Sequence, residues 1–200
     1  MKTAFSLLLV LLLLLLLMGC YPEFQTVRLT NVPVKGSGPN SAVDFDFILD
    51  DVQSRVRERL PDAYYRGAAF TGKCQDLPEL QGQIIVKYMQ VKPSFLLGQQ
   101  ILHATAVVTT SQGLMDITFR DVSDPYISTE EKPLATDNQF REITRIAHQH
   151  LLETGISDCE IAITQTRDTW NAMCRSPREA TADMCNFDID ADSGEITPQK

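Results

Sequence analysis

Three aspartates near the C-terminus have the spacing of residues that bind calcium. Asp188, Asp190 and Asp192 alternate along the chain, as do the oxygen ligands at positions 1, 3 and 5 of a calcium loop. That loop also needs glycine at position 6 and a bidentate glutamate at position 12, where this chain has Ser193 and Gln199. We therefore favour a hairpin with glycine at its turn, and keep the three aspartates as a weak candidate for a divalent-ion site.

No other set of residues has the spacing of a catalytic or metal site. His148 and His150 are two positions apart on a predicted helix, so they point in different directions, and His103 has no evident partner. The acidic and basic residues of segment 50–59 lie opposite an apolar stripe, which is typical of a solvated helix face. A glycine-rich phosphate loop, a G-x-S-x-G turn and an H-E-x-x-H pair are absent from the sequence. We therefore expect no enzymatic activity and no cofactor.

Residues 1–19 have the order of an export signal. Lys2 is followed by a leucine-rich apolar run that ends at Gly19 and Cys20. The uncharged stretch is about long enough for a helix to cross a bilayer. An uncleaved anchor and an ordinary signal peptide are therefore alternatives to a lipoprotein signal. The run ends without a basic stop-transfer flank, which argues against the anchor.

The quartet Leu17-Met18-Gly19-Cys20 resembles the lipobox of bacterial lipoproteins, although Met18 replaces the small or β-branched residue usual at its place. The resemblance implies that the leader is a lipoprotein signal peptide and that Cys20 becomes the acylated first residue, palmitate included. Several acyl chains on one residue make membrane attachment stable, whereas one chain holds only marginally. Tyr21 stands where an aspartate would imply retention in the inner membrane. This implies the periplasmic face of the outer membrane, for a Gram-negative host.

Four of the five cysteines remain once Cys20 is assigned to lipid. An even number in an exported chain predicts up to two disulfides, with three possible connectivities. We favour Cys174–Cys185, because a short local loop closes easily, together with Cys74–Cys159. The spacings typical of zinc ligands are absent, and no motif supports a catalytic thiol.

Composition describes an ordinary globular chain that carries excess negative charge. It has 200 residues, of which 44% are hydrophobic and 22% charged, and its formal net charge is −8. Non-specific nucleic-acid binding rests on lysine and arginine neutralising phosphates, so this balance argues against it. A chain of this size buries roughly 70% of its unfolded surface, which is enough for one core without a metal.

Hydrophobic periodicity predicts two helices among several strands. Helical spacing marks residues 44–60, ending before Pro61, and residues 136–154, which begin with the capping box Thr136-x-x-Gln139 and stop at Gly155. Residues 168–185 are expected to be irregular or weakly helical. Strand patterns cover residues 24–32, 64–71, 83–91, 101–110, 114–122 and 159–166.

This order predicts an α+β fold, in which one sheet buries the apolar stripes of both helices. We expect a two-layer sandwich of a mainly antiparallel sheet with two helices packed on it. The predicted parts are the signal peptide 1–19, the lipidated N-terminus with the first strand and a loop 20–43, the α+β body 44–166 sharing its sheet with strand 24–32, and a cysteine-containing tail with a possible hairpin 167–200.

The same order, together with the lipobox, resembles the small α/β lipoproteins of the bacterial envelope. This group includes YajG-like lipoproteins and the LptE-like lipoproteins of lipopolysaccharide assembly. The resemblance covers residues 24–155 and carries no catalytic motif. After Cys20 the chain reads Tyr21-Pro-Glu-Phe-Gln-Thr, whereas LptE-like chains have a short glycine-aromatic-x-Leu-Arg type segment there. That departure makes lipopolysaccharide handling the secondary alternative.

Lipidation and the absence of a catalytic signature predict a membrane-anchored periplasmic lipoprotein that is not an enzyme. It would bind another component of the cell envelope or support its assembly. Its expected partners are the membrane, through acylated Cys20, and an envelope protein, with no nucleic acid. A carrier of lipid or lipopolysaccharide is the alternative from a different class. An enzyme whose groups assemble from distant positions is a third.

Overall fold

A computed structural model of the chain describes residues 26–38, 42–94, 98–121, 135–166, 169–175 and 186–199. The predicted signal peptide, the predicted lipidation site Cys20 and the proposed disulfide partner Cys185 lie outside these residues. None of the helices in the described part is long and apolar enough to span a membrane.

The described strands form one nine-stranded sheet in which every neighbouring pair is antiparallel. In chain order the strands are β1 (Val27–Pro33), β2 (Tyr64–Lys73), β3 (Gly82–Ser94), β4 (Gly98–Thr109), β5 (Leu114–Asp121), β6 (Glu160–Gln165), β7 (Thr169–Arg175), β8 (Asn186–Asp190) and β9 (Ile196–Pro198). Across the sheet their order is β1-β5-β4-β3-β2-β6-β7-β8-β9. The predicted α+β class with a mainly antiparallel sheet is therefore confirmed.

Each of the two long helices begins after a side-chain cap, and the sequence predicted the second of these caps. The side chain of Asp44 accepts the backbone N–H of Phe47, and that of Thr136 accepts the backbone N–H of Gln139, as the capping box predicts. Gly155 follows the second helix with a φ of 74°, as expected of a glycine stop. The helices of the described residues are α2 (Phe45–Arg57), the 3₁₀ helix η1 (Cys74–Glu79) and α3 (Asp137–Glu153).

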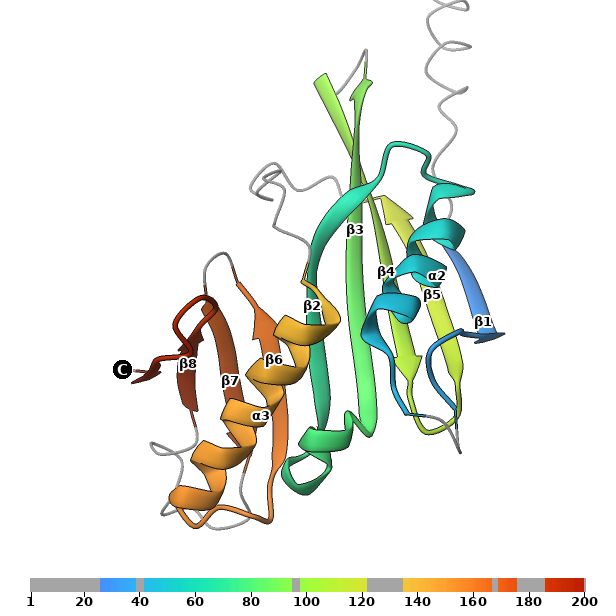
Figure 1. The fold of residues 1–200 in the computed structure, drawn as a ribbon. Coiled ribbons are helices and arrows are strands. Elements are labelled where there is room, and N and C mark those ends of the chain that lie inside the picture. The colour runs from blue at the N-terminus through green and yellow to red at the C-terminus, as the bar shows by residue number, and fades with distance from the viewer. Residues whose placement is uncertain are drawn as a thin grey trace, which may run out of the picture.

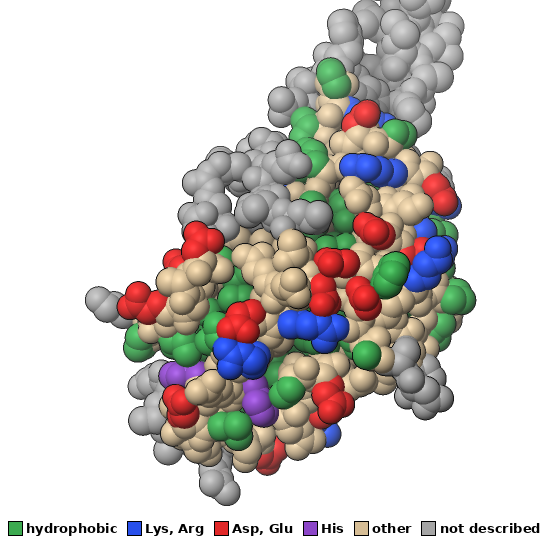
Figure 2. Space-filling view, viewed as in Figure 1, with side chains coloured by type: hydrophobic (Ala, Val, Ile, Leu, Met, Phe, Trp, Pro, Cys, Tyr) green, Lys and Arg blue, Asp and Glu red, His purple; other side chains and the backbone are tan. Residues whose placement is uncertain are grey.

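Aromatic side chains join both helices to the sheet in one core. The ring of Phe45 on α2 stacks on that of Phe140 on α3, with centroids 4.1 Å apart, and Phe140 meets Trp170 of β7 edge-on at 5.5 Å. All three side chains are fully buried. Figure 1 shows α2 in front of β4 and β5, and α3 running across β6 and β7. The helical side of the molecule in Figure 2 carries interspersed acidic and basic side chains.

The other side of the sheet carries the strand residues that alternate with the core residues, and we call it the outer face. On β3, for example, Ile84 and Val86 are fully buried in the core while Lys87 is exposed. One row of the outer face lies in register across seven strands and consists of Asp116, Val107, Ile85, Ala69, Thr164, Asn171 and Asp188. It is a mixed surface of polar and small apolar groups.

The C-terminal part of the chain corrects one expectation from the sequence. Residues 168–185 are not irregular or weakly helical throughout, because Thr169–Arg175 forms β7 between β6 and β8. Its sheet position is fixed by backbone pairing with strands on both sides and by the buried Trp170. The predicted hairpin is confirmed as β8 and β9, so the sheet of the α+β body continues through the tail.

Candidate functional site

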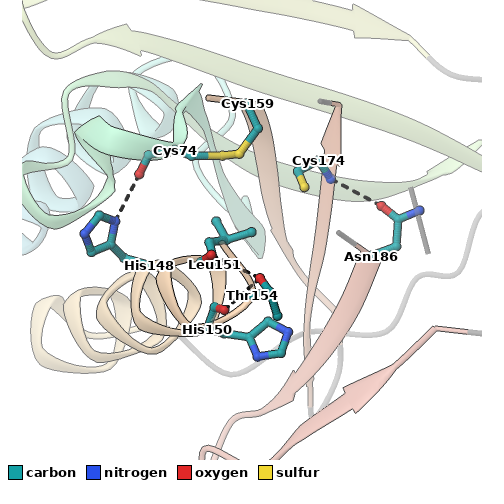
Figure 3. The surroundings of a disulfide bond; sticks show 8 residues. All are labelled: Cys74, His148, His150, Leu151, Thr154, Cys159, Cys174 and Asn186. Atoms are coloured by element: carbon teal, nitrogen blue, oxygen red, sulfur yellow. Dashed lines mark hydrogen bonds between the residues drawn. A yellow bond between two sulfur atoms is a disulfide. The ribbon is translucent and has the colours of Figure 1, made fainter. Parts of the chain in front are cut away.

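Two of the described cysteines that lie far apart in the sequence form a disulfide. Cys74, at the start of η1, is bonded to Cys159, which directly precedes β6, across a sequence separation of 85 residues (Figure 3). The backbone N–H of Cys74 also donates to the carbonyl of Cys159 at 2.9 Å. The predicted pairing of these two cysteines is therefore confirmed, and its place against the core indicates a structural role.

Cys174 on β7 is disulfide-bonded as well. The partner favoured by the sequence, Cys185, lies outside the described residues, so that pairing stays a prediction. The backbone N–H of Cys174 donates to the side-chain oxygen of Asn186 on β8 at 3.2 Å, which ties the two strands together beside the cysteine (Figure 3). All three described cysteines are thus in disulfides, and a thiol nucleophile has no candidate among them.

The two helical histidines lie in different surroundings (Figure 3). His148 Nδ1 lies 3.1 Å from the carbonyl oxygen of Cys74, and the ring of His150 meets Phe187 of β8 edge-on at 4.5 Å. Their roles are those of packing and hydrogen-bonding groups around the disulfide. Of the charged residues on α2, Asp51 pairs with Arg55 at 3.3 Å in an i, i+4 salt bridge.

The carboxylates of Asp188 and Asp190, two of the three aspartates of the candidate ion site, have separate partners. One carboxylate oxygen of Asp190 accepts the backbone N–H groups of Asp192 and Ser193 and the Ser193 hydroxyl, so the aspartate organises the hairpin turn. The backbone N–H of Ser193 contributes most to holding the pKa of Asp190 below its ordinary value. Asp188 instead accepts from Asn171 and Gln199. Among the described residues, no group of three or more histidine, cysteine, aspartate or glutamate side chains is arranged to hold a metal ion.

Two hollows lie on the outer face of the sheet. The larger, about 670 Å³, lies where β2, β3, β6, β7 and β8 adjoin, next to Cys174, and a second of about 320 Å³ lies over β1, β4 and β5. Both are open grooves with polar and apolar walls. The larger one is lined by, among others, Thr71, Gln83, Glu160, Ala162, Met173 and Arg175.

Four basic side chains from four strands gather on the outer face, and we call them the basic cluster. His103 of β4 lies directly opposite Arg120 of β5, and Lys87 of β3 is diagonal to His103, whose own partner on β3 is Met89. Arg66 of β2 is the extra residue of a bulge, where the register with β3 shifts. The cluster is therefore Arg66, Lys87, His103 and Arg120.

The basic cluster has no negative partner among the described residues. None of its four side chains takes part in a salt bridge there. Arg66 Nη1 and His103 Nε2 are buried atoms without a hydrogen-bond partner, whereas Lys87 and Arg120 are exposed. Burial, and then the charges of Arg120, Arg66 and Lys87, lower the pKa of His103. The site is a positively charged surface with two unused nitrogen atoms.

The sequence contains only part of the signal for this cluster. Strand alternation places Lys87 and His103 on one side of their strands, yet the pairing register decides that they meet Arg120. Arg66 joins them through a bulge, and no local sequence motif predicts that bulge.

The outer face is thus the part of the described surface that combines grooves with unpaired basic groups. Neither disulfide, neither helical histidine and none of the three aspartates adds a catalytic arrangement to it. Comparison of the chain with protein-family models, with curated proteins and with solved structures finds no match.

Proposed function

We propose that the protein is a lipoprotein, anchored by acylated Cys20 at the periplasmic face of an outer membrane, that is not an enzyme and binds another component of the envelope. The observation that carries this proposal is the leader, an apolar run that follows Lys2 and ends at Leu17-Met18-Gly19-Cys20. The predicted resemblance to YajG-like and LptE-like envelope lipoproteins is part of the same proposal. The tether would keep the domain at a membrane, close to the envelope component that it binds.

The outer face is the proposed binding surface. Most large apolar side chains of the strands point to the core on the other side, although Met89 and Ile101 are buried on the outer face itself. It presents the basic cluster and both grooves. We propose, in addition, that the sheet and its two helices form a two-layer sandwich with this face turned outward. The stacking of Phe45 on Phe140 supports that arrangement.

The anchor is tested by replacing Cys20 with alanine and measuring the mass of the mature protein and its partition into membranes. We expect acyl mass and membrane association for the unaltered chain, and loss of both in Cys20→Ala. The matched control is Tyr21→Ser, which changes the next residue and leaves the lipidated position intact. Acyl mass on the Cys20→Ala protein, or its absence from the unaltered protein, would refute lipidation of this cysteine.

The binding role is tested by photo-cross-linking in cells. A photoreactive residue at Val107 or Thr164 lies on the outer face, whereas one at Leu152 lies exposed on α3. We expect a reproducible envelope partner from the two outer-face positions and not from Leu152. The same products from all three positions, or none from any, would count against the outer face as the binding surface.

A carrier of lipid or lipopolysaccharide is the second candidate, because the groove of about 670 Å³ has the volume of a small-molecule site. Its walls include charged Glu160 and Arg175 beside apolar Ala162 and Met173, which suits a head group better than an acyl chain. Native mass spectrometry of Cys20→Ala protein separates the two roles. Lipid that co-purifies without the covalent anchor would favour the carrier.

A further inference from the structure

We propose that the basic cluster binds the phosphate of an anionic lipid head group at the membrane surface that holds Cys20. The membrane as the source of that phosphate rests on the proposed function, since it requires the tether. The affinity for a phosphate-type anion rests on the cluster alone.

The charge of the cluster is unbalanced in a way that an anion would correct. Like charges on neighbouring strands destabilise a sheet, and Lys87 of β3 pairs with Gly67 of β2, the residue next to Arg66. Other basic groups of this face have acidic neighbours: Arg28 pairs with Asp116 at 2.9 Å, and Arg175 lies opposite Glu160 in register. The described residues provide no such neighbour for the cluster. An oxyanion would supply it.

The spacing of the cluster suits one phosphate group. Side chains directly opposite each other on antiparallel strands have Cβ atoms about 4.5–5.5 Å apart, as for His103 and Arg120, and diagonal pairs such as Lys87 and His103 lie about 7–8 Å apart. Long basic side chains converge easily over such distances. The exposed Lys87 and Arg120 would meet the phosphate first. Arg66 Nη1 and His103 Nε2 are buried without a partner and would donate to phosphate oxygens after their side chains turn toward the anion, in the case of His103 when that nitrogen carries a proton.

The tether would bring this cluster to the membrane. Val27, the first residue of β1, pairs with Phe119, the residue next to Arg120. The chain from Cys20 to Val27 spans at most about 25 Å when fully extended. A lipid on Cys20 therefore keeps the cluster close to phosphorylated head groups, and basic groups near an anionic leaflet are attracted to it.

The test is a titration of the full chain in a neutral detergent with short-chain, monomeric phosphatidylglycerol, followed by ligand-induced shifts of the His103 ring signals in NMR spectra. Short-chain phosphatidylcholine and inorganic phosphate are the parallel titrants. We expect saturable binding of phosphatidylglycerol with a rise of the His103 pKa, at least tenfold weaker binding of phosphatidylcholine, and binding of inorganic phosphate no tighter than that of phosphatidylglycerol.

The diagnostic variant is Lys87→Gln with Arg120→Gln, because both side chains are exposed and the core is left intact. We expect it to bind phosphatidylglycerol at least tenfold more weakly. The matched control is Arg28→Gln with Arg145→Gln, which changes the net charge equally at exposed side chains outside the cluster. The variant Arg66→Gln, in the same phosphatidylglycerol titration, tests separately whether the partly buried Arg66 contributes to binding.

Three results would overturn the proposal: no saturable phosphatidylglycerol binding, equal weakening by both double variants, or tighter binding of inorganic phosphate than of phosphatidylglycerol. The last result would identify a site for free phosphate. Whether Cys20 anchors the protein is determined independently, by measuring the acyl mass on Cys20. An unacylated Cys20 would refute the tether, and with it the membrane as the source, whatever the titration shows.

Discussion

Asp46 and Asp137 hold the starts of the two helices together, because the side chain of each accepts a backbone N–H from the start of the other helix. Asp46 Oδ1 accepts the backbone N–H of Asp137 at 2.8 Å, and Asp137 Oδ1 accepts the backbone N–H of Phe45 at 2.8 Å. Helix N-termini carry unpaired N–H groups and the positive ends of the helix dipoles, so two of them side by side require acceptors. The two carboxylates satisfy both ends, and the stacked rings of Phe45 and Phe140 lie beside them.

We expect Asp137→Ala to lower the free energy of unfolding by about 1–3 kcal/mol, because it leaves the Phe45 N–H without its acceptor and frees Arg141, which pairs with Asp137 at 2.6 Å. Asp46→Ala should cost about 0.5–2 kcal/mol. Urea unfolding of both variants and of the double variant measures these losses and the coupling between them. Asp158→Ala, at an exposed position, is the control. Additive losses would show that the two carboxylates act independently.

The disulfide between Cys74 and Cys159 should contribute substantially to stability. It closes a long loop, with a sequence separation of 85 residues, and such cross-links restrict the unfolded chain. We expect Cys74→Ser with Cys159→Ser to lower the free energy of unfolding by about 3–5 kcal/mol in guanidinium titrations without reductant. Ser157→Ala is the nearby control that leaves the bond in place. An unchanged midpoint would mean that this bond has little effect on the folding equilibrium.

His103 should make the protein less stable in mild acid. Burial and the charges of Arg120, Arg66 and Lys87 lower its pKa in the folded state below the ordinary value of 6.5. Between those two pKa values the unfolded chain binds more protons, so the free energy of unfolding falls as the pH decreases through that range. Thermal unfolding from about pH 8 to about pH 5 measures this slope, which His103→Gln should reduce. Arg120→Gln should raise the His103 pKa, and an unchanged NMR titration in that variant would contradict the proposed cause.

The turn between β8 and β9 should depend on Asp190 and not on calcium. Three donors from Asp192 and Ser193 already occupy one carboxylate oxygen of Asp190. We expect calorimetry of the full chain to show no heat of binding at millimolar calcium. Asp190→Ala should lower the midpoint of urea unfolding, and Asp192→Ala should lower it by less. A saturable calcium signal that disappears in Asp190→Ala would restore the ion site.

Local chemistry explains why the sequence predicted the helices and hairpins well. The cap at Thr136 and the stop at Gly155 act within a few residues of the helix they bound, and Gly194 adopts a positive φ of 70° in the turn of the predicted hairpin. Strand β7 was not predicted, because polar and apolar residues are mixed along Thr169–Arg175. Its pairing with β6 and β8 and the burial of Trp170 against Phe140 determine its conformation, and neither is local.

The sequence by itself determined the apolar leader, the cysteine at its end, where both helices start and the even set of cysteines left for disulfides; α2 ends at Arg57, three residues before the predicted end. It left three disulfide connectivities open and gave His103 no partner. The tertiary structure decided that Cys74 meets Cys159 and that His103 faces Arg120. The physical reason is that strand register and bulges are set by backbone hydrogen bonds between distant segments, and a shift of one residue would turn each side chain to the opposite face.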